Sequence, residues 1–533
     1  MKKQDYANNK TLLKLAIRRD RIKIPIWLLS IFSVVTLITR VYGDFSVQDM
    51  KEITVMASTS PGMRLLIAPL SPESVGELGQ FFLMRMSAII AVLVAMMSIQ
   101  LIIRHTRNNE ETGCSELLSS TVVGRYSSLT SALILAIVSN IIVSILIALG
   151  LVLNGLSLEG SLVAGASFGA LGILFSAIAG ITAQLSESSR GSNGLSAIII
   201  GVLFVLNSIG NVMGTVNVDG MGFESAWAVW ISPLGWAQQM HPFDQNNWWI
   251  LCFFIVSFIL LTRIAFVLVN HRDVGRGILS ARKGTPTAAN WLKNPLGLTF
   301  RLQRISLASW IIALLFLGLI FGAASTEFGE IVEDMDAFPH LQRTAEMFMF
   351  SLIGLIAAVV SIFTMLSILR IYSEENGGPL ESVLSTAVSR TKIFLSYIVF
   401  SMLGTIAIIG SFSFGIALAS EGNFSQGLEY IKAGLLQATA IIPIAGLIIA
   451  IYGLFPKVSK TISWLVVFTA LMLGPFFGPM LNLSESVQKI SPFSHIAVIP
   501  SDISYMNVTI LLTVGFVFAI IGIKSFNNRN LSL

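Results

Sequence analysis

The chain has 533 residues, of which 54% are hydrophobic and only 12% are charged, and its mean hydropathy is +0.79. This balance excludes a soluble globular protein and predicts an integral membrane protein. The formal net charge of +5 does not call for a nucleic-acid partner, because Lys and Arg gather on the cytoplasmic loops of membrane proteins.

Apolar runs of roughly 18 to 25 residues recur along the chain, each long enough to cross about 30 Å of hydrocarbon as a helix. They predict an all-α multi-pass protein of the bacterial plasma membrane with about twelve transmembrane helices. Basic residues before the first run, in the middle of the chain and after the last run predict that both termini are cytoplasmic. The predicted spans lie near residues 24–42, 82–103, 128–153, 161–184, 195–214, 249–270, 306–325, 348–370, 392–419, 433–455, 461–481 and 506–524.

Residues 11–23, before the first span, mix apolar and basic side chains in a pattern typical of a helix lying in the membrane interface. The pattern returns 283 positions later, before the seventh span. Ordinary anchoring by positive charge at the cytoplasmic face accounts for it equally well. The residues assigned to these interfacial helices are Arg18, Arg21 and Trp27, matched by Arg301, Arg304 and Trp310.

An acidic segment, Glu110 to Arg125, follows the second predicted span, and a similar segment recurs without gaps 265 positions later, from Glu375 to Arg390. Transmembrane helices need only short connections, so a repeated polar segment indicates a surface on which something outside the membrane acts. Carboxylates favour the start of a helix, and the Leu and Val residues that follow predict a short helix whose apolar side faces the spans. Well-capped surface helices without a partner remain an alternative. The residues assigned to this surface are Glu110, Glu111, Gly113, Glu116 and Arg125 in the first copy and Glu374, Glu375, Gly378, Glu381 and Arg390 in the second.

The loop from Val216 to Trp249 carries five tryptophans, which favours a segment resting on the outer face of the membrane. It predicts either an aromatic belt or a helix or re-entrant segment that gates substrate exit. The gate candidates are Pro233, Trp236, Pro242, Trp248 and Trp249.

The repeated pattern before the first and seventh spans and the repeated acidic segment predict two parallel six-helix repeats related by an axis along the membrane normal. The first is residues 1–270 and the second is residues 301–533, joined by a cytoplasmic linker, 271–300, that is rich in Gly and Pro. The copies differ where Asn376 replaces Glu111 and Pro379 replaces Cys114, which predicts two acidic surfaces of unequal strength. The two cysteines predict neither a disulfide nor a metal site.

The paired Glu, the Gly, the Glu-x-x-Leu and the Val-x-Arg ending of the acidic segment resemble the segment between the second and third spans of ABC-2 type exporter permeases. The stretch from Ser232 to Phe243 with Trp248-Trp249, and the stretch from Ser491 to His495, are similar to the twelve-span branch labelled exporters of polyketide antibiotics. The resemblance implies that the acidic segments are coupling helices that dock on two copies of a separate ATPase subunit. It also implies that ATP and Mg are bound by those subunits.

The chain contains no Gly-x-x-x-x-Gly-Lys-Ser/Thr phosphate loop, so we expect no enzymatic activity and no cofactor of its own. Spans rich in Leu, Ile, Phe and Met predict a hydrophobic or amphipathic small-molecule substrate such as an antibiotic, a drug or a lipid. The expected function is the permease subunit of an ATP-driven exporter. An ion-gradient transporter is one alternative, although we place no carboxylate inside a span. A non-transporting scaffold or sensor is the other.

Overall fold

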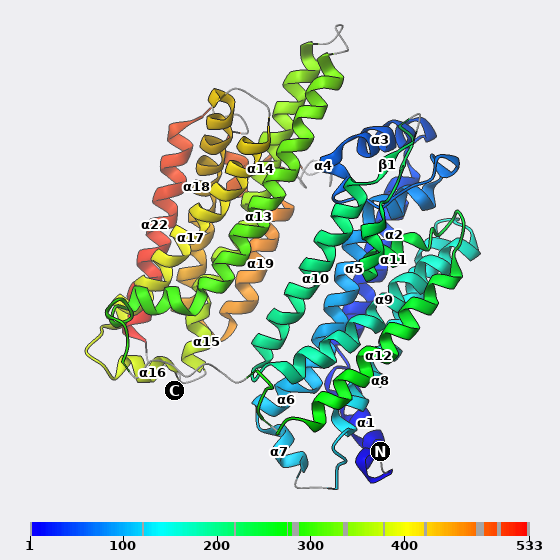
Figure 1. The fold of residues 1–533 in the computed structure, drawn as a ribbon. Helices are drawn as coiled ribbons and strands as arrows, with labels where there is room; N and C mark the ends of the chain where they lie inside the picture. The colour runs from blue at the N-terminus through cyan, green and yellow to red at the C-terminus, as the bar shows by residue number, and fades with distance from the viewer. Residues whose placement is uncertain are drawn as a thin grey trace. The chain divides into compact units, whose positions relative to one another are not determined.

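A computed structural model of the chain (Figure 1) forms two compact units, Met1–Gly284 and Thr285–Leu533, which we call the first and second unit. The division falls within the segment predicted as a linker. The residues that the structure describes are 3–119, 122–217, 220–273, 275–279, 287–333, 339–376, 379–420, 424–475, 484–497 and 503–529.

The first unit is a bundle of long helices with short elements at both ends. The long helices are α2 (Lys23–Gly43), α5 (Leu78–His105), α8 (Ser127–Val152), α9 (Leu158–Leu185), α10 (Ser189–Val212) and α12 (Leu251–Asn270). The short elements are η1 (Lys3–Tyr6), α1 (Asn9–Arg19), α3 (Val47–Thr59), α4 (Pro61–Arg64), η2 (Pro72–Ser74), α6 (Arg107–Glu111), α7 (Cys114–Ser119), β1 (Thr215–Val216), β2 (Phe223–Glu224), η3 (Trp227–Ile231), α11 (Pro233–Gln239) and η4 (Trp248–Ile250).

Helix α9 lies at the centre of the first unit and packs against α5, α8 and α12. Small residues on α9 allow this close approach. A Cβ atom on Gly165 would lie 2.3 Å from the carbonyl oxygen of Ser144, and one on Gly172 would lie 1.9 Å from the side-chain oxygen of Asn140. Close contact between small residues is a main source of helix association inside a membrane, where lipid is as apolar as the side chains.

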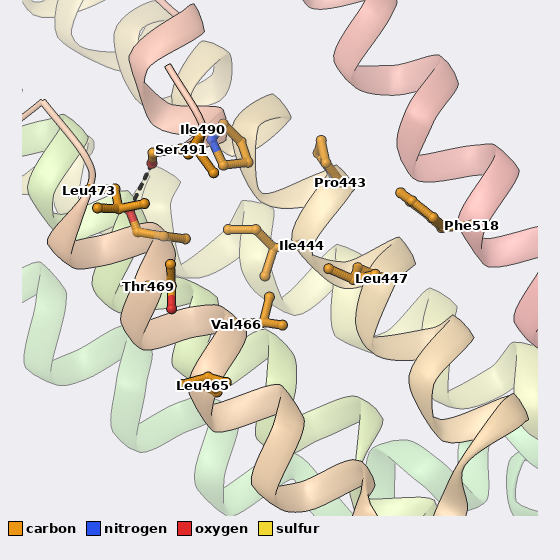
Figure 2. A pocket seen from close by; sticks show the side chains of 12 residues that line it. Pro443, Ile444, Leu447, Leu465, Val466, Thr469, Leu473, Ile490, Ser491 and Phe518 are labelled. Carbon is orange, nitrogen blue, oxygen red and sulfur yellow. Dashed lines mark hydrogen bonds between the residues drawn. The ribbon is translucent and has the colours of Figure 1, made fainter. Parts of the chain in front are cut away.

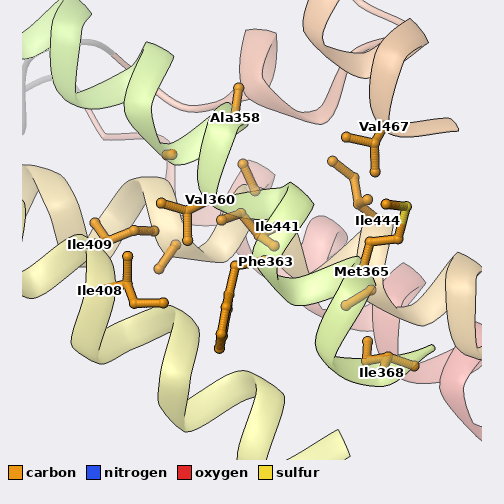
Figure 3. Packing of buried hydrophobic residues seen from close by; sticks show 14 of the residues in the cluster. Ala358, Val360, Phe363, Met365, Ile368, Ile408, Ile409, Ile441, Ile444 and Val467 are labelled. Atoms are coloured by element: carbon orange, nitrogen blue, oxygen red, sulfur yellow. The ribbon is translucent and has the colours of Figure 1, made fainter. Parts of the chain in front are cut away.

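The second unit has a similar series of helices. They are α13 (Pro295–Glu333), α14 (Pro339–Ile368), α15 (Arg370–Asn376), α16 (Pro379–Leu384), α17 (Arg390–Ala419), α18 (Phe424–Leu454), α19 (Ser459–Met472), α21 (Glu485–Gln488) and α22 (Tyr505–Asn528), with η5 (Asn290–Lys293), η6 (Pro456–Val458) and η7 (Pro492–His495). Figure 3 shows side chains of α14, α17, α18 and α19 meeting in its apolar core. Gly446 and Gly453 bring α18 against the backbone of α22 at Gly515 and Gly522.

In the part of the chain that the structure describes, eleven helices are long and apolar enough to cross a membrane, and each overlaps a predicted span. The span predicted at 461–481 begins as α19, which has 14 residues. At 1.5 Å per residue a helix of that length reaches only about 21 Å. Residues 476–480 lie outside the described residues, so the twelfth span stays a prediction.

The two predicted interfacial segments have different local structures. In the first unit α1 ends at Arg19, and a new helix, α2, begins at Lys23. In the second unit Arg301 to Trp310 lie inside the continuous helix α13. The difference has a local cause, because Pro25 in the first turn of α2 disfavours a helix running through the preceding residues, whereas Ala308 occupies the matched position in α13.

Candidate functional site

Each acidic segment folds as two short helices at one end of its unit. In the first unit these are α6 and α7, which meet at Gly113, whose φ of 73° lies in the left-handed region that favours glycine. In the second unit they are α15 and α16, and the matched Gly378 lies outside the described residues. Both α7 and α16 are shorter than the helix predicted to run as far as Arg125 or Arg390.

Glu110 holds the first acidic segment against two distant helices. Its carboxylate pairs with Arg272, with Nη2 2.5 Å from Oε1 and Nη1 2.8 Å from Oε2. Arg107 contacts the same carboxylate at 2.5 Å. Arg272 also donates from Nε to the side-chain oxygen of Gln184, near the end of α9, at 2.5 Å. We call Glu110, Gln184 and Arg272 the first cluster; a two-pronged arginine–carboxylate contact of this kind fixes orientation as well as distance.

Glu375 occupies the matched position in the second unit and makes a similar set of contacts. Its carboxylate accepts hydrogen bonds from Tyr452 at 2.5 Å and from Nη2 of Arg529 at 2.6 Å. The guanidinium of Arg529 lies 4.7 Å from the ring centroid of Tyr452. Tyr452 is near the end of α18, and Arg529 directly follows α22. We call Glu375, Tyr452 and Arg529 the second cluster.

The arginine at the end of each acidic segment contacts the same region of its unit. Arg125 donates to the backbone carbonyls of Val269, Asn270 and Arg272 at 3.0 to 3.2 Å. Arg390 donates to the carbonyl of Arg529 at 3.0 Å.

The residue after each arginine bonds to an asparagine near the end of the last long helix. Tyr126 donates to Asn270 at 2.6 Å, and Thr391 accepts from Asn527 at 2.9 Å. Each acidic segment is therefore fastened near its start and at its end to α12 or to α22.

Glu111 and Glu374 make further local contacts. Glu111 accepts from the backbone N–H of Ser189 at 2.9 Å and from its hydroxyl, which ties α6 to the start of α10. Glu374 pairs with Arg370 one helical turn away at 2.9 Å. In the first acidic segment both Glu110 and Glu111 thus bind residues outside their own helix. In the second, Glu375 does so and Glu374 pairs within its own helix.

A buried carboxylate that the sequence analysis did not assign lies beside the first acidic segment. Asp20 has no exposed side-chain surface, and it pairs with Arg104 at 2.9 Å and with His105 at 2.5 Å at the end of α5. Burial alone would raise its pKa, but the hydrogen bond from His105 and the charges of His105 and Arg104 hold the pKa of Asp20 below its ordinary value. The matched residue in the second unit is the neutral Gln303, which is also buried.

The interfacial candidates divide into exposed cations and half-buried tryptophans. Arg18, Arg21, Arg301 and Arg304 are exposed, while the two tryptophans pack partly against their units. The matched Trp27 and Trp310 each line a cavity between helices.

The N-terminal residues brace the end of the first acidic segment. The backbone N–H groups of Gly124 and Tyr126 donate to the carbonyls of Ala7 and Asp5 at 3.1 and 3.0 Å. Asn8 donates to the carbonyl of Val122 at 2.6 Å. A Cβ atom on Gly124 would lie 2.2 Å from the backbone of Asp5, so this contact depends on glycine.

Gly124→Ala is therefore expected to detach the N-terminal residues. Forced overlap with backbone costs about 1 to 3 kcal/mol, so trypsin should cut after Lys3 and Lys10 roughly tenfold faster in the variant. Gly194→Ala is the matched control, because nothing lies within 4 Å of a Cβ atom there. Equal cleavage rates in the two variants would show that the bracing contact does not hold the N-terminus.

The exposed surfaces of the two acidic segments differ. In the first, Leu117 and Val122 are 75% and 78% exposed, and Glu116 is exposed beside them. In the second, Glu381 is exposed, but Leu380 is buried in the core of its own unit. Leu380 fastens α16 to the core of its unit, but the matched residue of the first copy is the polar Ser115. Helix α7 therefore lacks this apolar anchor.

The gate candidates lie at the opposite end of the first unit. Trp236 donates to the carbonyl of Trp230 at 2.7 Å, and the rings of Trp230 and Trp249 stack with centroids 6.0 Å apart. Pro233 begins α11, Trp248 begins η4, and the carbonyl of Pro242 accepts from Gln80 of α5 at 2.6 Å. These contacts define a packed aromatic region, and its role as a gate stays a prediction.

Sequence analysis did not foresee that the loop after α2 packs onto this region. Leu70 forms a β-bridge to Phe223, and the buried Arg64 donates to the carbonyl of Gly214 at 3.0 Å. Asn211, near the end of α10, donates to the carbonyl of Ile67 at 2.9 Å. Two loops far apart in sequence thus form one folded layer at this end of the unit.

An apolar cavity of about 300 Å³ lies between α18, α19 and α22 in the second unit. Figure 2 shows Ile444 and Leu447 of α18, Val466 and Thr469 of α19, and Phe518 of α22 around it. The hydroxyl of Ser491 donates to the carbonyl of Ala470 at 2.7 Å and so presents little polarity to the cavity. Its volume and lining are those of a site for a small hydrophobic molecule.

Eleven helices that are able to cross a membrane, among the described residues, make this a multi-pass membrane protein of the plasma membrane. The family described as multidrug efflux system permease Rv1217c, C-terminal domain, matches residues 10–269 and 292–527. The multidrug efflux system permease protein Rv1217c of Mycobacterium tuberculosis (strain ATCC 25618 / H37Rv) is 31% identical over 542 residues, covering 97% of this chain and 94% of that protein. The chain belongs to this family of permeases. The unmatched residues between the two ranges, 270–291, overlap the segment predicted as a linker.

Proposed function

We propose that the chain is the permease subunit of an ATP-driven ABC-2 type exporter, of the twelve-span branch labelled exporters of polyketide antibiotics. In this proposal two ATPase subunits dock on the acidic segments from the cytoplasm, and ATP and Mg are bound by those subunits. The name of the related permease, a multidrug efflux protein, supports efflux of drug-like compounds. The apolar cavity in the second unit supports a hydrophobic or amphipathic substrate.

The observation that carries the proposal is the matched fastening of the two acidic segments. A force applied to α6 and α7 passes through Glu110 and Arg272 into the ends of α9 and α12. In the second unit the same force passes through Glu375 into the ends of α18 and α22. Short charge-assisted contacts resist displacement, so motion of a docked subunit would move long helices and not merely deform a loop.

The two rival functions predict other behaviour. An ion-driven transporter would depend on titratable groups along its spans and would export without an ATPase. A scaffold or sensor would leave substrate distribution unchanged on deletion. Substrate-stimulated ATP hydrolysis by a purified complex of this chain with a candidate ABC ATPase subunit separates both from the exporter.

Charge reversal on the exposed surface tests the docking assignment. We expect Glu116→Lys and Glu381→Lys to weaken binding of the ATPase about tenfold each and to lower substrate-stimulated hydrolysis. The introduced lysine would face a positively charged group of the ATPase that the glutamate attracts, and like charges are unfavourable across an interface. The loss should be larger for Glu116→Lys, because Leu117 is exposed beside it whereas Leu380 is buried.

The matched control is Glu159→Lys, an exposed carboxylate at the start of α9, the end remote from the acidic segment. It should leave both binding and hydrolysis unchanged. The docking assignment is wrong if the variants at Glu116 and Glu381 retain the affinity and the stimulated hydrolysis of the Glu159 variant.

A further inference from the structure

A second cavity in the second unit has a different character from the apolar one. It has a volume of about 330 Å³ and lies between α13, α14, α15 and α19, at the end of the unit that carries the acidic segment. Its lining includes the cations Arg370 and Lys460 and the rings of Trp310 and Trp464. Tryptophan and basic residues together are typical of the boundary between membrane and water.

The polar groups of this cavity are incompletely satisfied by the protein. Lys460 has no carboxylate within 4 Å among the described residues, and its ammonium group lies 4.5 Å from the ring centroid of Tyr372. Arg370 uses Nε to pair with Glu374, and no described residue accepts from its terminal nitrogens. Ser367 also lines the cavity, and its side chain is buried. Arg370 and Lys460 therefore keep N–H donors for which the described residues supply no hydrogen-bond acceptor.

The first unit contains a cavity of about 420 Å³ that is lined by residues at several of the same repeat positions. The second cavity lacks the carboxylate that lines the first. Trp27 occupies the place of Trp310, and Asn108 that of Ser373. There, however, the wall includes the carboxylate of Asp20, which is paired with Arg104 and His105. The second cavity has the neutral Gln303 at the position of Asp20 and Arg370 at that of His105, while Ser306 and Leu369 replace Lys23 and Arg104. Each cavity is thus lined by two cations, but only the lining of the first includes a carboxylate.

We propose that the second cavity binds the phosphate group of an anionic phospholipid. Arg370 and Lys460 contact the phosphate oxygens, and an acyl chain lies along Trp310 and Trp464. Basic pockets between membrane helices are suited to anionic headgroups, because the cations are screened less there than on an open surface. In the first unit Asp20 places a carboxylate in the wall of the cavity, whereas in the second unit Glu374 pairs with Nε of Arg370 and does not line the cavity. The proposal does not depend on the ATPase partners.

The test uses the full-length protein in detergent micelles and phosphatidylglycerol with brominated acyl chains, which quench the fluorescence of tryptophans that they touch. Brominated phosphatidylcholine, which has no net charge, is the lipid control. We expect saturable quenching by phosphatidylglycerol at a concentration at least about tenfold lower than by phosphatidylcholine. Trp464→Phe should remove a large part of the saturable signal.

Two substitutions locate the binding. Lys460→Gln should weaken phosphatidylglycerol binding about tenfold, whereas Lys457→Gln, an exposed lysine three positions earlier that does not line the cavity, should change it less than twofold. Gln303→Glu, which places a carboxylate in the wall with little change of volume, should weaken binding as Lys460→Gln does. Lys23→Gln in the matched cavity of the first unit should have no effect.

The proposal is overturned if the two lipids quench alike, or if Lys460→Gln and Lys457→Gln behave alike while both variants remain monodisperse with unchanged thermal midpoints. Inorganic phosphate is titrated separately and followed by thermal shift. If it alone stabilises the protein at low millimolar concentration in a manner that depends on Lys460, and lipid does not compete with it, the occupant is a free anion and the assignment to a lipid is wrong.

Discussion

Replacing Glu375 with Ala is expected to destabilise the second unit by about 3 to 5 kcal/mol, the usual result of removing one partner from a buried ion pair. The side chain of Glu375 is 2% exposed, and its carboxylate is the charge partner of Arg529 at 2.6 Å. Without it the guanidinium stays against the rings of Tyr452 and Phe526, and no other carboxylate of the described residues pairs with it. The midpoint of thermal unfolding in detergent measures the loss.

Glu374→Ala is a close control, because it removes a carboxylate one position earlier in the same helix. Glu374 pairs with Arg370 four positions away, and such helical pairs contribute only about 0.2 to 0.5 kcal/mol. Glu375→Gln should fall between the two, since the amide oxygen still accepts from Tyr452. Equal midpoints for Glu375→Ala and Glu374→Ala would show that the second cluster does not hold the unit together.

The sequence predicted the long helices well, because the hydropathy of a span is a property of about twenty consecutive residues. Eleven predicted spans overlap membrane-length helices among the described residues. A separate helix was expected before both the first and the seventh span; the structure has one before α2, but residues 301–310 lie inside the continuous helix α13. The replacement of Pro25 by Ala308 in the second copy was visible in the sequence, but its consequence was not foreseen. This replacement accounts for two helices, α1 and α2, in the first unit and one continuous helix, α13, in the second.

The acidic segments were recognised from their repetition, but their partners were not. Arg272 and Arg529 are 162 and 154 positions from the glutamates that they bind. Each follows the last long helix of its unit, and the sequence analysis interpreted them only as part of the general positive charge on cytoplasmic loops. Their matched place after the sixth span of each half was the available signal. No local pattern indicated Gln184 or Tyr452, whose role depends on where α9 and α18 end.

Asp20 was missed for a related reason. It stands between Arg19 and Arg21, so the sequence favours a solvated, strongly basic segment in which one carboxylate merely pairs with its neighbours. The structure turns those two arginines outward and buries Asp20 against the end of α5. A single acidic residue inside a basic segment that adjoins a span can therefore indicate a buried ion pair.

Asp20→Ala is the second substitution with a large expected effect, again about 3 to 5 kcal/mol, because it leaves Arg104 and His105 without their shared carboxylate. Gln303→Ala at the matched position should cost the second unit about 1 kcal/mol, since only a neutral hydrogen bond from its side-chain amide to the backbone carbonyl of Ser367 and some packing are lost. The thermal midpoint of each variant gives the comparison.

Asp20 also makes stability depend on pH. Because its folded pKa lies below the ordinary aspartate value of about 4, the charged form stabilises the folded state above that value. The contribution is lost as pH falls through the folded pKa, so the wild-type midpoint should decline below about pH 4. Asp20→Asn removes this titration, and its midpoint should start lower at pH 7 and change less between pH 5 and pH 3. If the thermal midpoints of the two proteins change in parallel between pH 5 and pH 3, protonation of Asp20 is not coupled to folding. The contact of Asp20 with Arg104 and His105 would then be a neutral one.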